Sequence, residues 1–181
     1  GSEKMRLFST GNLEIGSFNA SGGSTGVKFD VGGGTSETEI QTSVNGTATR
    51  IHYAFRNDNG EVGKITTNGS ATTYATSSDY RLKENVTDVT DGITRLKQLA
   101  PKRFNFIADA NKTVDGFIAH EVSSVVPEAI AGEKDEVDAD GNPKWQGIDQ
   151  SKLVPLLTAA LQEAITKIET LETKVAALEA E

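Results

Sequence analysis

The C-terminal stretch from about residue 150 to 181 repeats apolar side chains every seven residues. Two positions of the repeat form a seam, with Val154, Leu161, Ile168 and Val175 on one and Leu157, Ala164, Leu171 and Leu178 on the other. This period predicts a long helix that coils around copies of itself, because a partner helix must cover the seam. An amphipathic helix packed on its own domain is the alternative, since such a helix also repeats apolar residues at spacings of three and four.

The two halves of the chain differ in composition. Residues 1–77 contain 13 of the 18 Gly and 21 Ser or Thr, but none of the four Pro. Residues 78–181 contain all four Pro, the single Trp, and 12 Lys or Arg against 19 Asp or Glu, which accounts for −7 of the net charge of −8. We therefore predict two domains that meet near residue 77, the first rich in turns and β structure.

Residues 1–77 carry the signals of a β meander. Asn-Gly pairs, which favour tight hairpins, occur at Asn45-Gly46, Asn59-Gly60 and Asn68-Gly69. Ile51, Tyr53 and Phe55 alternate with polar residues, so one strand face is apolar. The apolar stretches are short, and so thin a core predicts association with neighbouring chains; a small independent β domain is the alternative. His52, on the polar face, is predicted to be a surface or intersubunit residue without a chemical role.

Residues 78–181 predict an α+β unit upstream of the long helix. The expected elements are a helix that begins after the N-cap Asp91 and ends at Pro101, strands around 104–106 and 117–118, a short helix from about Glu121 to Pro127, and a hairpin over 136–148. The hairpin turns at Asp140-Gly141-Asn142-Pro143, and it is the one hairpin expected in this half.

Composition excludes several classes of function. The chain has no Cys, so disulfides, thiolate metal sites and a cysteine nucleophile are ruled out. Its acidic balance argues against nucleic acid and anionic membranes as partners. No apolar run approaches the roughly 20 residues that span a bilayer, and the first five residues lack the apolar core of a signal peptide. We therefore expect neither membrane insertion nor a secretory route.

One stretch superficially resembles a calcium loop. Asp138, Asp140 and Asn142 alternate as calcium ligands do, but Pro143 stands where the loop needs Gly and Asp149 where it needs Glu. We predict no metal site and no cofactor.

A hydroxyl and an amine stand five residues apart at the boundary, on Ser78 and Lys83. A neutral lysine can take the proton of a serine hydroxyl and so activate it as a nucleophile. Lysine titrates near 10.4 in water, so a lysine base requires burial or a nearby cation. By itself the spacing fits a solvated lysine beside a linker serine equally well.

Four motifs occur in order along residues 78–181: Ser78-Asp79-x-Arg81-x-Lys83 with Asn85; Gly116-Phe117-Ile118-Ala119-His120-Glu121-Val122; Val126-Pro127-Glu128-Ala129; and Leu153-Val154-Pro155-Leu156-Leu157 with Ala160-Leu161-Gln162-Glu163. Together they resemble the C-terminal intramolecular chaperone domain of phage tailspikes and tail fibres, best known from endosialidases. Residues 1–77 resemble only generic tail-fibre sequence.

The resemblance implies a mixed fold for the whole chain. A trimeric, Gly/Ser/Thr-rich β fibre segment at 1–77 would precede an α+β chaperone domain at 78–181, which ends in a trimeric coiled coil at about 150–181. The homotrimer would assemble in the host cytoplasm and become part of the virion tail fibre. The chaperone would then be released and be absent from the mature fibre.

The resemblance also implies a self-cleaving serine peptidase of single turnover, acting within one chain or within the trimer. The cut falls between Ser77 and Ser78, with Ser78 as nucleophile and Lys83 as base. The hydroxyl of Ser78 would attack the carbonyl of its own preceding peptide through a five-membered ring, which exchanges an amide for an ester.

Three further residues are expected to support this chemistry: Asp79, Arg81 and His120. Arg81 would favour the neutral amine by like-charge repulsion or hold the carbonyl oxygen. His120 is a supporting residue only, because many relatives carry Gln at the matching position.

Two other functions remain open. The domain could be a non-cleaving structural trimerisation cap, in which the Ser/Lys pair is unproductive. The β segment could also bind a host surface receptor or a glycan, with Tyr53, Phe55 and Tyr74 as candidate contacts.

Overall fold

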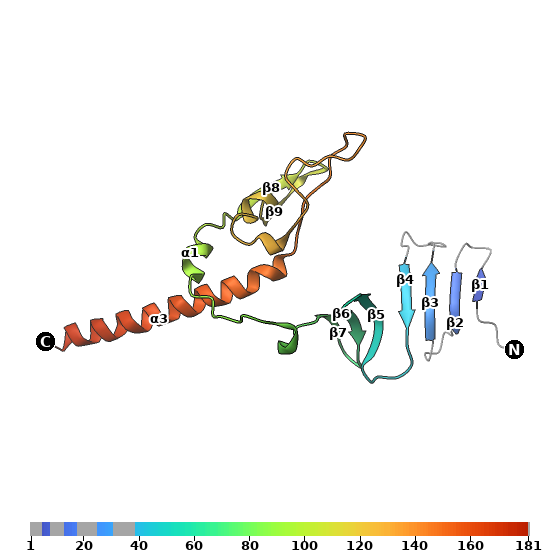
Figure 1. Cartoon of the computed structure of the whole chain (residues 1–181), viewed down its shortest axis with the longest axis horizontal. Coiled ribbons are helices and arrows are strands. Elements are labelled where there is room, and N and C mark those ends of the chain that lie inside the picture. Colours follow the sequence, from blue (N-terminus) through green and yellow to red (C-terminus); the bar gives the residue numbers. More distant parts are fainter. Residues whose placement is uncertain (1–4, 8–12, 18–24, 31–38, 181) are drawn as a thin grey trace. The chain divides into compact units, whose positions relative to one another are not determined.

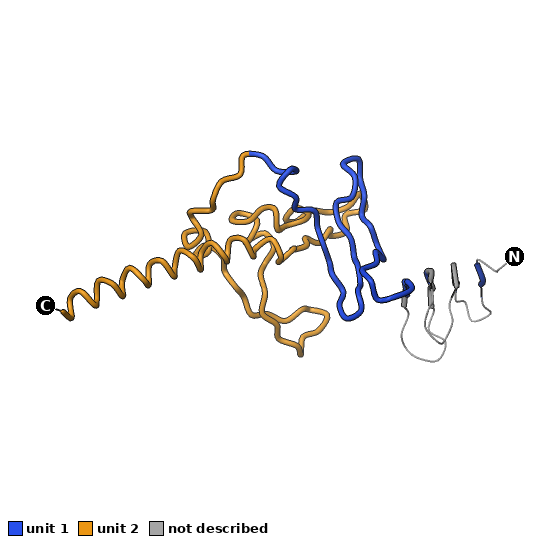
Figure 2. The backbone as a smooth tube through the Cα atoms, turned by 90° about the horizontal axis from the view of Figure 1, so that it is seen from below, with its two compact units in different colours: residues 1–84 blue, residues 85–181 orange. Residues whose placement is uncertain are grey.

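The computed structural model describes residues 5–7, 13–17, 25–30 and 39–180 of the chain. Its internal contacts divide the chain into two compact units, a first unit of Gly1–Glu84 and a second unit of Asn85–Glu181 (Figure 2). The division falls a few residues after the boundary near residue 77 that the composition predicts. Both β structure and a long C-terminal helix are present, as the predicted mixed fold requires.

The first unit contains two antiparallel sheets. One is a meander of β1 (Met5–Leu7), β2 (Leu13–Ser17), β3 (Thr25–Asp30) and β4 (Glu39–Ser43), seen at the blue end of the chain in Figure 1. The other consists of β5 (Arg50–Asn57), β6 (Gly60–Thr67) and β7 (Thr72–Thr76), with β6 in the centre. A β meander is therefore confirmed for the described part of this half.

Two of the three Asn-Gly pairs form hairpins. Asp58 and Asn59 connect β5 to β6, and Gly60 takes a φ of 96° that favours glycine. Between β6 and β7, the side-chain oxygen of Asn68 accepts hydrogen bonds from the backbone N–H groups of Ser70 and Ala71, each 2.9 Å long. This side-chain turn closes the hairpin without a positive φ at Gly69.

The hairpin predicted at Asn45-Gly46 is wrong. The strands on either side, β4 and β5, belong to different sheets, so this pair lies in a connection between sheets. His52 links the two strands instead, since its ring nitrogens hydrogen-bond to the hydroxyls of Thr42 and Thr67, each over 2.7 Å. His52 is therefore a half-buried structural residue within its own chain.

The apolar face of β5 is open to solvent in the single chain. Ile51 is 48% exposed, Tyr53 40% and Phe55 53%. The central strand β6, by contrast, contains the buried Gly63 and Thr66. Association with neighbouring chains, which would cover this face, stays a prediction.

The second unit is built from short elements and one long helix. In chain order these are α1 (Gly92–Leu96), β8 (Lys102–Phe106), β9 (Asp109–Gly116), α2 (Ala119–Val122), η2 (Pro127–Ala129), β10 (Ile130–Ala131), β11 (Gly147–Ile148), η3 (Gln150–Leu153) and α3 (Val154–Glu179). The predicted helix after Asp91 and the strand at 104–106 are confirmed.

The strand predicted at 117–118 is wrong, because β9 ends at Gly116 and Ile118 is the extended residue before α2. The β8–β9 hairpin was not predicted, since β9 is polar and lacks strand-forming residues over most of its length. Cross-strand pairing compensates: Arg103 forms two hydrogen bonds to Asp115, of 2.7 and 2.9 Å, beside the packed rings of Phe104 and Phe106.

The hairpin predicted over 136–148 is reduced to a turn with a single bridge, between Val137 and Pro143. Asp138 organises the turn, because one of its carboxylate oxygens accepts from the N–H groups of Asp140 and Asn142, each over 2.9 Å. These hydrogen bonds from Asn142, together with those from Asp140 and Gly141, lower the pKa of Asp138. The alternating acidic and amide residues are thus accounted for by the turn itself. β11 pairs with β10 instead.

The core of the second unit lies between α2, η2 and the first turns of α3. Its buried residues are Val122, Val125, Val126, Ala129, Leu153 and Leu156. Ala159 and Ala160 on α3 are also buried. The helix therefore packs on its own domain at its beginning, through residues that lie outside the predicted seam.

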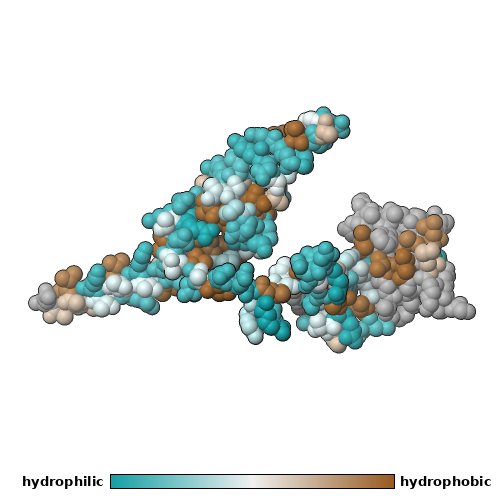
Figure 3. All heavy atoms as spheres, in the orientation of Figure 1, coloured by the Kyte–Doolittle hydropathy of each residue, from teal (hydrophilic) through white to brown (hydrophobic). Residues whose placement is uncertain are grey.

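The heptad seam of α3 remains open to solvent. Seven of its eight side chains are exposed, from 46% for Leu157 to 70% for Leu178: Val154, Leu157, Leu161, Ile168, Leu171, Val175 and Leu178. Apolar residues are accordingly visible along this helix in Figure 3. Among the described residues, no helix combines the length and the apolar character needed to cross a membrane.

Candidate functional site

A single turn of 3-10 helix, η1 (Tyr80–Leu82), follows β7 near the end of the first unit. Asp79 caps it, since its carboxylate accepts a hydrogen bond of 2.9 Å from the backbone N–H of Arg81. The N–H groups of Leu82 and Lys83 close the turn on the carbonyls of Asp79 and Tyr80, each over 3.1 Å. The turn reverses the chain, so that Lys83 points back toward Ser78.

Ser78 and Lys83 are in direct contact. The side-chain nitrogen of Lys83 lies 2.8 Å from Oγ of Ser78, which is hydrogen-bond distance. Both residues are exposed in this unit. The structure thus brings together the two residues that the motif predicts as base and nucleophile, and proton transfer between a hydroxyl and an amine requires this separation.

Asp79 and Arg81 form an ion pair beside the Ser78–Lys83 contact. Two nitrogens of the Arg81 guanidinium donate to the two carboxylate oxygens of Asp79, over 2.9 and 2.8 Å. The side chain of Arg81, then its backbone N–H, and finally the charge of Lys83 hold the pKa of Asp79 below its usual value. Because Asp79 balances the charge of Arg81, the clearest role of this pair is to shape the turn that presents Lys83.

His120 belongs to the second unit, at the second position of α2, and is exposed. It lines a pocket of about 420 Å³ together with the turn region 133–137 and residues 143–146. Trp145, 85% exposed, stands at this pocket. Neither the pocket nor its aromatic wall was predicted from the sequence, because both depend on how the turn at 138–142 folds.

The described part of the chain contains no cluster of three or more His, Asp or Glu residues that could hold a metal ion. The nearest sequence candidate, Asp138, already uses its carboxylate within its own turn.

Comparison with known proteins places a family on this region. No curated protein sequence matches the chain. Residues 78–131 match the model of the Peptidase_S74 family, described as the chaperone of endosialidase. The match begins at Ser78, includes Lys83 and His120, and ends at the last residue of β10. The resemblance seen in the sequence motifs is confirmed for this segment, and residues 78–131 are therefore a chaperone domain of the endosialidase type.

Proposed function

We propose that this chain is the C-terminal region of a phage tail fibre or tailspike, whose chaperone domain folds and trimerises the β segment and then releases itself between Ser77 and Ser78. The observation that carries the proposal is the 2.8 Å contact between Lys83 and Ser78 at the first residue of the family match. Before release the assembly would lie in the host cytoplasm, and the mature fibre in the virion would lack residues 78–181.

The reaction follows from the position of Ser78 on the leaving side of the bond. Its hydroxyl attacks the carbonyl carbon of Ser77, and the neutral amine of Lys83 takes the hydroxyl proton. The new C–O bond closes a five-membered ring. Lys83 returns the proton to the backbone nitrogen of Ser78, the C–N bond breaks, and an ester remains between Ser77 and the Ser78 side chain. Water hydrolyses the ester, which leaves a carboxylate on Ser77 and restores the hydroxyl of Ser78.

Assembly would supply what the isolated junction lacks. An exposed lysine is protonated in neutral water, whereas removal of water favours the uncharged amine. Burial of the Ser78–Lys83 pair in the finished trimer would therefore activate the base, and cleavage would report that assembly is complete.

The exposed seam of α3 is the surface that supports trimerisation. Ile168, Leu171 and Val175 line a groove of about 340 Å³ on this face. Apolar side chains at this spacing are covered when helices of neighbouring chains interlock.

A non-cleaving trimerisation cap is the second candidate function. The observation that favours it is the exposure of the Ser78–Lys83 pair, since a solvated lysine is a poor base. Either function is compatible with binding of a host receptor or glycan by the β segment, where Tyr53, Phe55 and Tyr74 are exposed.

Mass spectrometry of freshly produced protein, beside denaturing electrophoresis, separates the two candidates. We expect fragments 1–77 and 78–181 from the wild type and one intact chain from Ser78→Ala, whose small side chain preserves the fold. An intact wild-type chain would favour the non-cleaving cap. Fragments from Ser78→Ala would remove Ser78 from the mechanism.

A further inference from the structure

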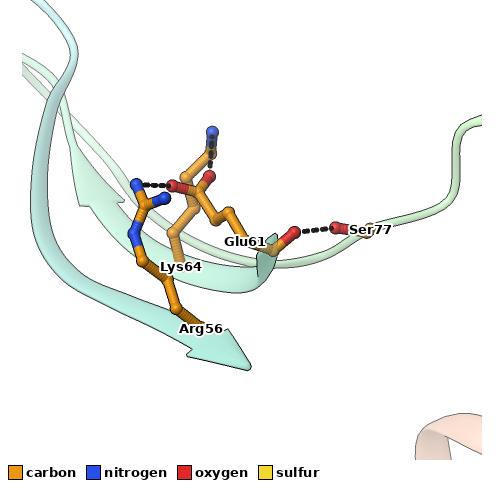
Figure 4. Close-up of polar contacts among 4 residues, drawn as sticks. All are labelled: Arg56, Glu61, Lys64 and Ser77. Carbon is orange, nitrogen blue, oxygen red and sulfur yellow. Dashed lines mark hydrogen bonds and ion pairs between the residues drawn. The ribbon is translucent and has the colours of Figure 1, made fainter. Parts of the chain in front are cut away.

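The residue before the proposed cut is fastened to the β sheet by two hydrogen bonds. The backbone N–H of Ser77 donates to the carbonyl of Val62 over 3.0 Å. Its side-chain hydroxyl donates to the carbonyl of Glu61 over 2.9 Å, as Figure 4 shows. Both acceptors belong to β6, and Ser77 thus extends the β6–β7 pairing one residue beyond Thr76, which pairs with Gly63.

Glu61 is itself held in place at this end of the sheet. One oxygen of its carboxylate accepts from Arg56 on β5 over 2.9 Å, and the other from Lys64 on β6 over 3.0 Å (Figure 4). Arg56 and Glu61 are also partners in the β5–β6 register. The carbonyl that receives the Ser77 hydroxyl therefore belongs to a residue that side-chain contacts tie to both strands of the β5–β6 hairpin.

The two bonds restrain Ser77 but leave its reacting group free. They fix the N–H side of the residue and the direction of its side chain. Among the described residues, no hydrogen bond involves the carbonyl oxygen of Ser77, the group that Ser78 would attack. Holding a reacting group in a limited set of orientations lowers the entropic part of a barrier, and this applies to a ring closure that needs one face of the carbonyl.

We propose that Ser77 is a positioning residue for the self-cleavage, and that its attachment to β6 makes the cut depend on a folded β5–β7 sheet. The inference rests on the proposed function, since it concerns the same bond. The nucleophile and the base come from the junction turn, whereas the acyl group is presented by the sheet. A chain whose β6–β7 pairing has not formed would carry the same Ser78 and Lys83 but a freely rotating Ser77, and its cleavage would be slow.

The test compares cleavage rates of full chains during cell-free synthesis. Radioactive methionine labels the N-terminal fragment alone, because Met5 is the single methionine of the sequence. Loss of one hydrogen bond predicts a rate about 2- to 10-fold lower for Ser77→Ala. Ser77→Thr, which keeps the hydroxyl, should restore the rate. Thr76→Ala is the matched control, since it deletes a neighbouring hydroxyl without a hydrogen bond among the described residues, and should leave the rate unchanged.

Two further measurements separate positioning from a general loss of stability. The pH at which the rate is half-maximal should be the same in Ser77→Ala as in the wild type, because neither nucleophile nor base is altered. Gly63→Ala places a Cβ 2.9 Å from the carbonyl oxygen of Ala75 and so disturbs β6–β7 pairing. It should slow cleavage more than Ser77→Ala, although the junction residues are intact.

The outcomes distinguish this inference from the proposed function. A wild type that is never cut overturns the proposed function and this inference with it. A wild type that is cut, together with Ser77→Ala cut at the same rate, overturns the positioning role alone. The positioning role is also overturned if Ser77→Thr is as slow as Ser77→Ala, or if Gly63→Ala is cut at the wild-type rate.

Discussion

The carboxylate of Glu163 in α3 accepts hydrogen bonds from the backbone N–H groups of Gly92 and Ile93, the first two residues of α1. Asp91 occupies the N-cap position, but its side chain makes no capping hydrogen bond within the described structure. The cap of α1 is therefore supplied by a residue 71 positions later in the chain. The placement of α1, which follows the junction, consequently depends on α3.

We expect Glu163→Ala to lower the free energy of unfolding by about 1 to 3 kcal/mol, because it removes a charged acceptor and leaves helix N–H groups without their partner. Asp91→Ala should have a much smaller effect. Urea unfolding of the full chain at fixed protein concentration measures both. Equal losses in the two variants would contradict the assignment of the cap to Glu163.

A methyl group at residue 92 should be poorly tolerated. A Cβ there would lie 2.5 Å from the backbone nitrogen of Ala160 and 2.7 Å from the carbonyl carbon of Ala159. We expect Gly92→Ala to destabilise the second unit by about 1 to 3 kcal/mol or more, because α1 must move away from α3. Gly147→Ala is the matched control, since no described atom lies within 4 Å of its Cβ. Thermal unfolding of both variants checks the difference.

Lys83→Arg should stop cleavage while retaining the positive charge at the junction. The guanidinium stays protonated at any workable pH and cannot accept the proton of Ser78. Denaturing electrophoresis of the variant should show a single intact chain. Cleavage at the wild-type rate would make Lys83 a structural residue.

His120→Gln should slow cleavage or leave it unaltered, as expected for a supporting residue. His120 lies in the second unit, whereas Ser78 and Lys83 form their contact within the first. The rate is measured by the same labelling assay as for Ser77. Complete loss of cleavage would show that this protein depends on its imidazole.

The double variant Ile168→Asn, Leu171→Asn should weaken trimers sharply. Each buried amide without a partner costs roughly 1 to 3 kcal/mol in each chain. Thr166→Asn with Glu169→Asn is the matched control, because these residues have the same spacing but lie opposite the seam. Sedimentation analysis beside a cleavage assay measures both consequences.

Three outcomes decide what assembly contributes. A seam variant that is monomeric and uncut would support a site completed by assembly. A monomeric variant that is fully cleaved would show that Ser78 and Lys83 work within one chain. A variant that is still trimeric would show that the seam is dispensable.

Features encoded by near neighbours in the sequence were predictable. The heptad period predicts α3, and Asn59-Gly60 and Asn68-Gly69 predict the two hairpins of the β5–β7 sheet, because helix period and turn geometry are local properties. The five-residue spacing of Ser78 and Lys83 likewise predicts their contact, since one turn of helix between them suffices to close it.

Features that depend on distant residues were missed or wrong. β9 is polar and has weak strand propensity, and it forms because Arg103 and Asp115 pair across the hairpin. Asn45-Gly46 has a turn sequence, yet it connects two sheets, because His52 hydrogen-bonds to Thr42 rather than leaving β4 to pair with β5.

The sequence by itself determined that the chain ends in a long amphipathic helix and begins its chaperone domain at Ser78, because periodicity and motif spacing are written along the chain. Only the tertiary structure decided that Glu163 caps α1 and that Ser77 is fastened to Glu61 and Val62. The physical reason is that a hydrogen bond between residues far apart in sequence exists only when packing has brought donor and acceptor within about 3 Å. No local pattern of residues records that approach.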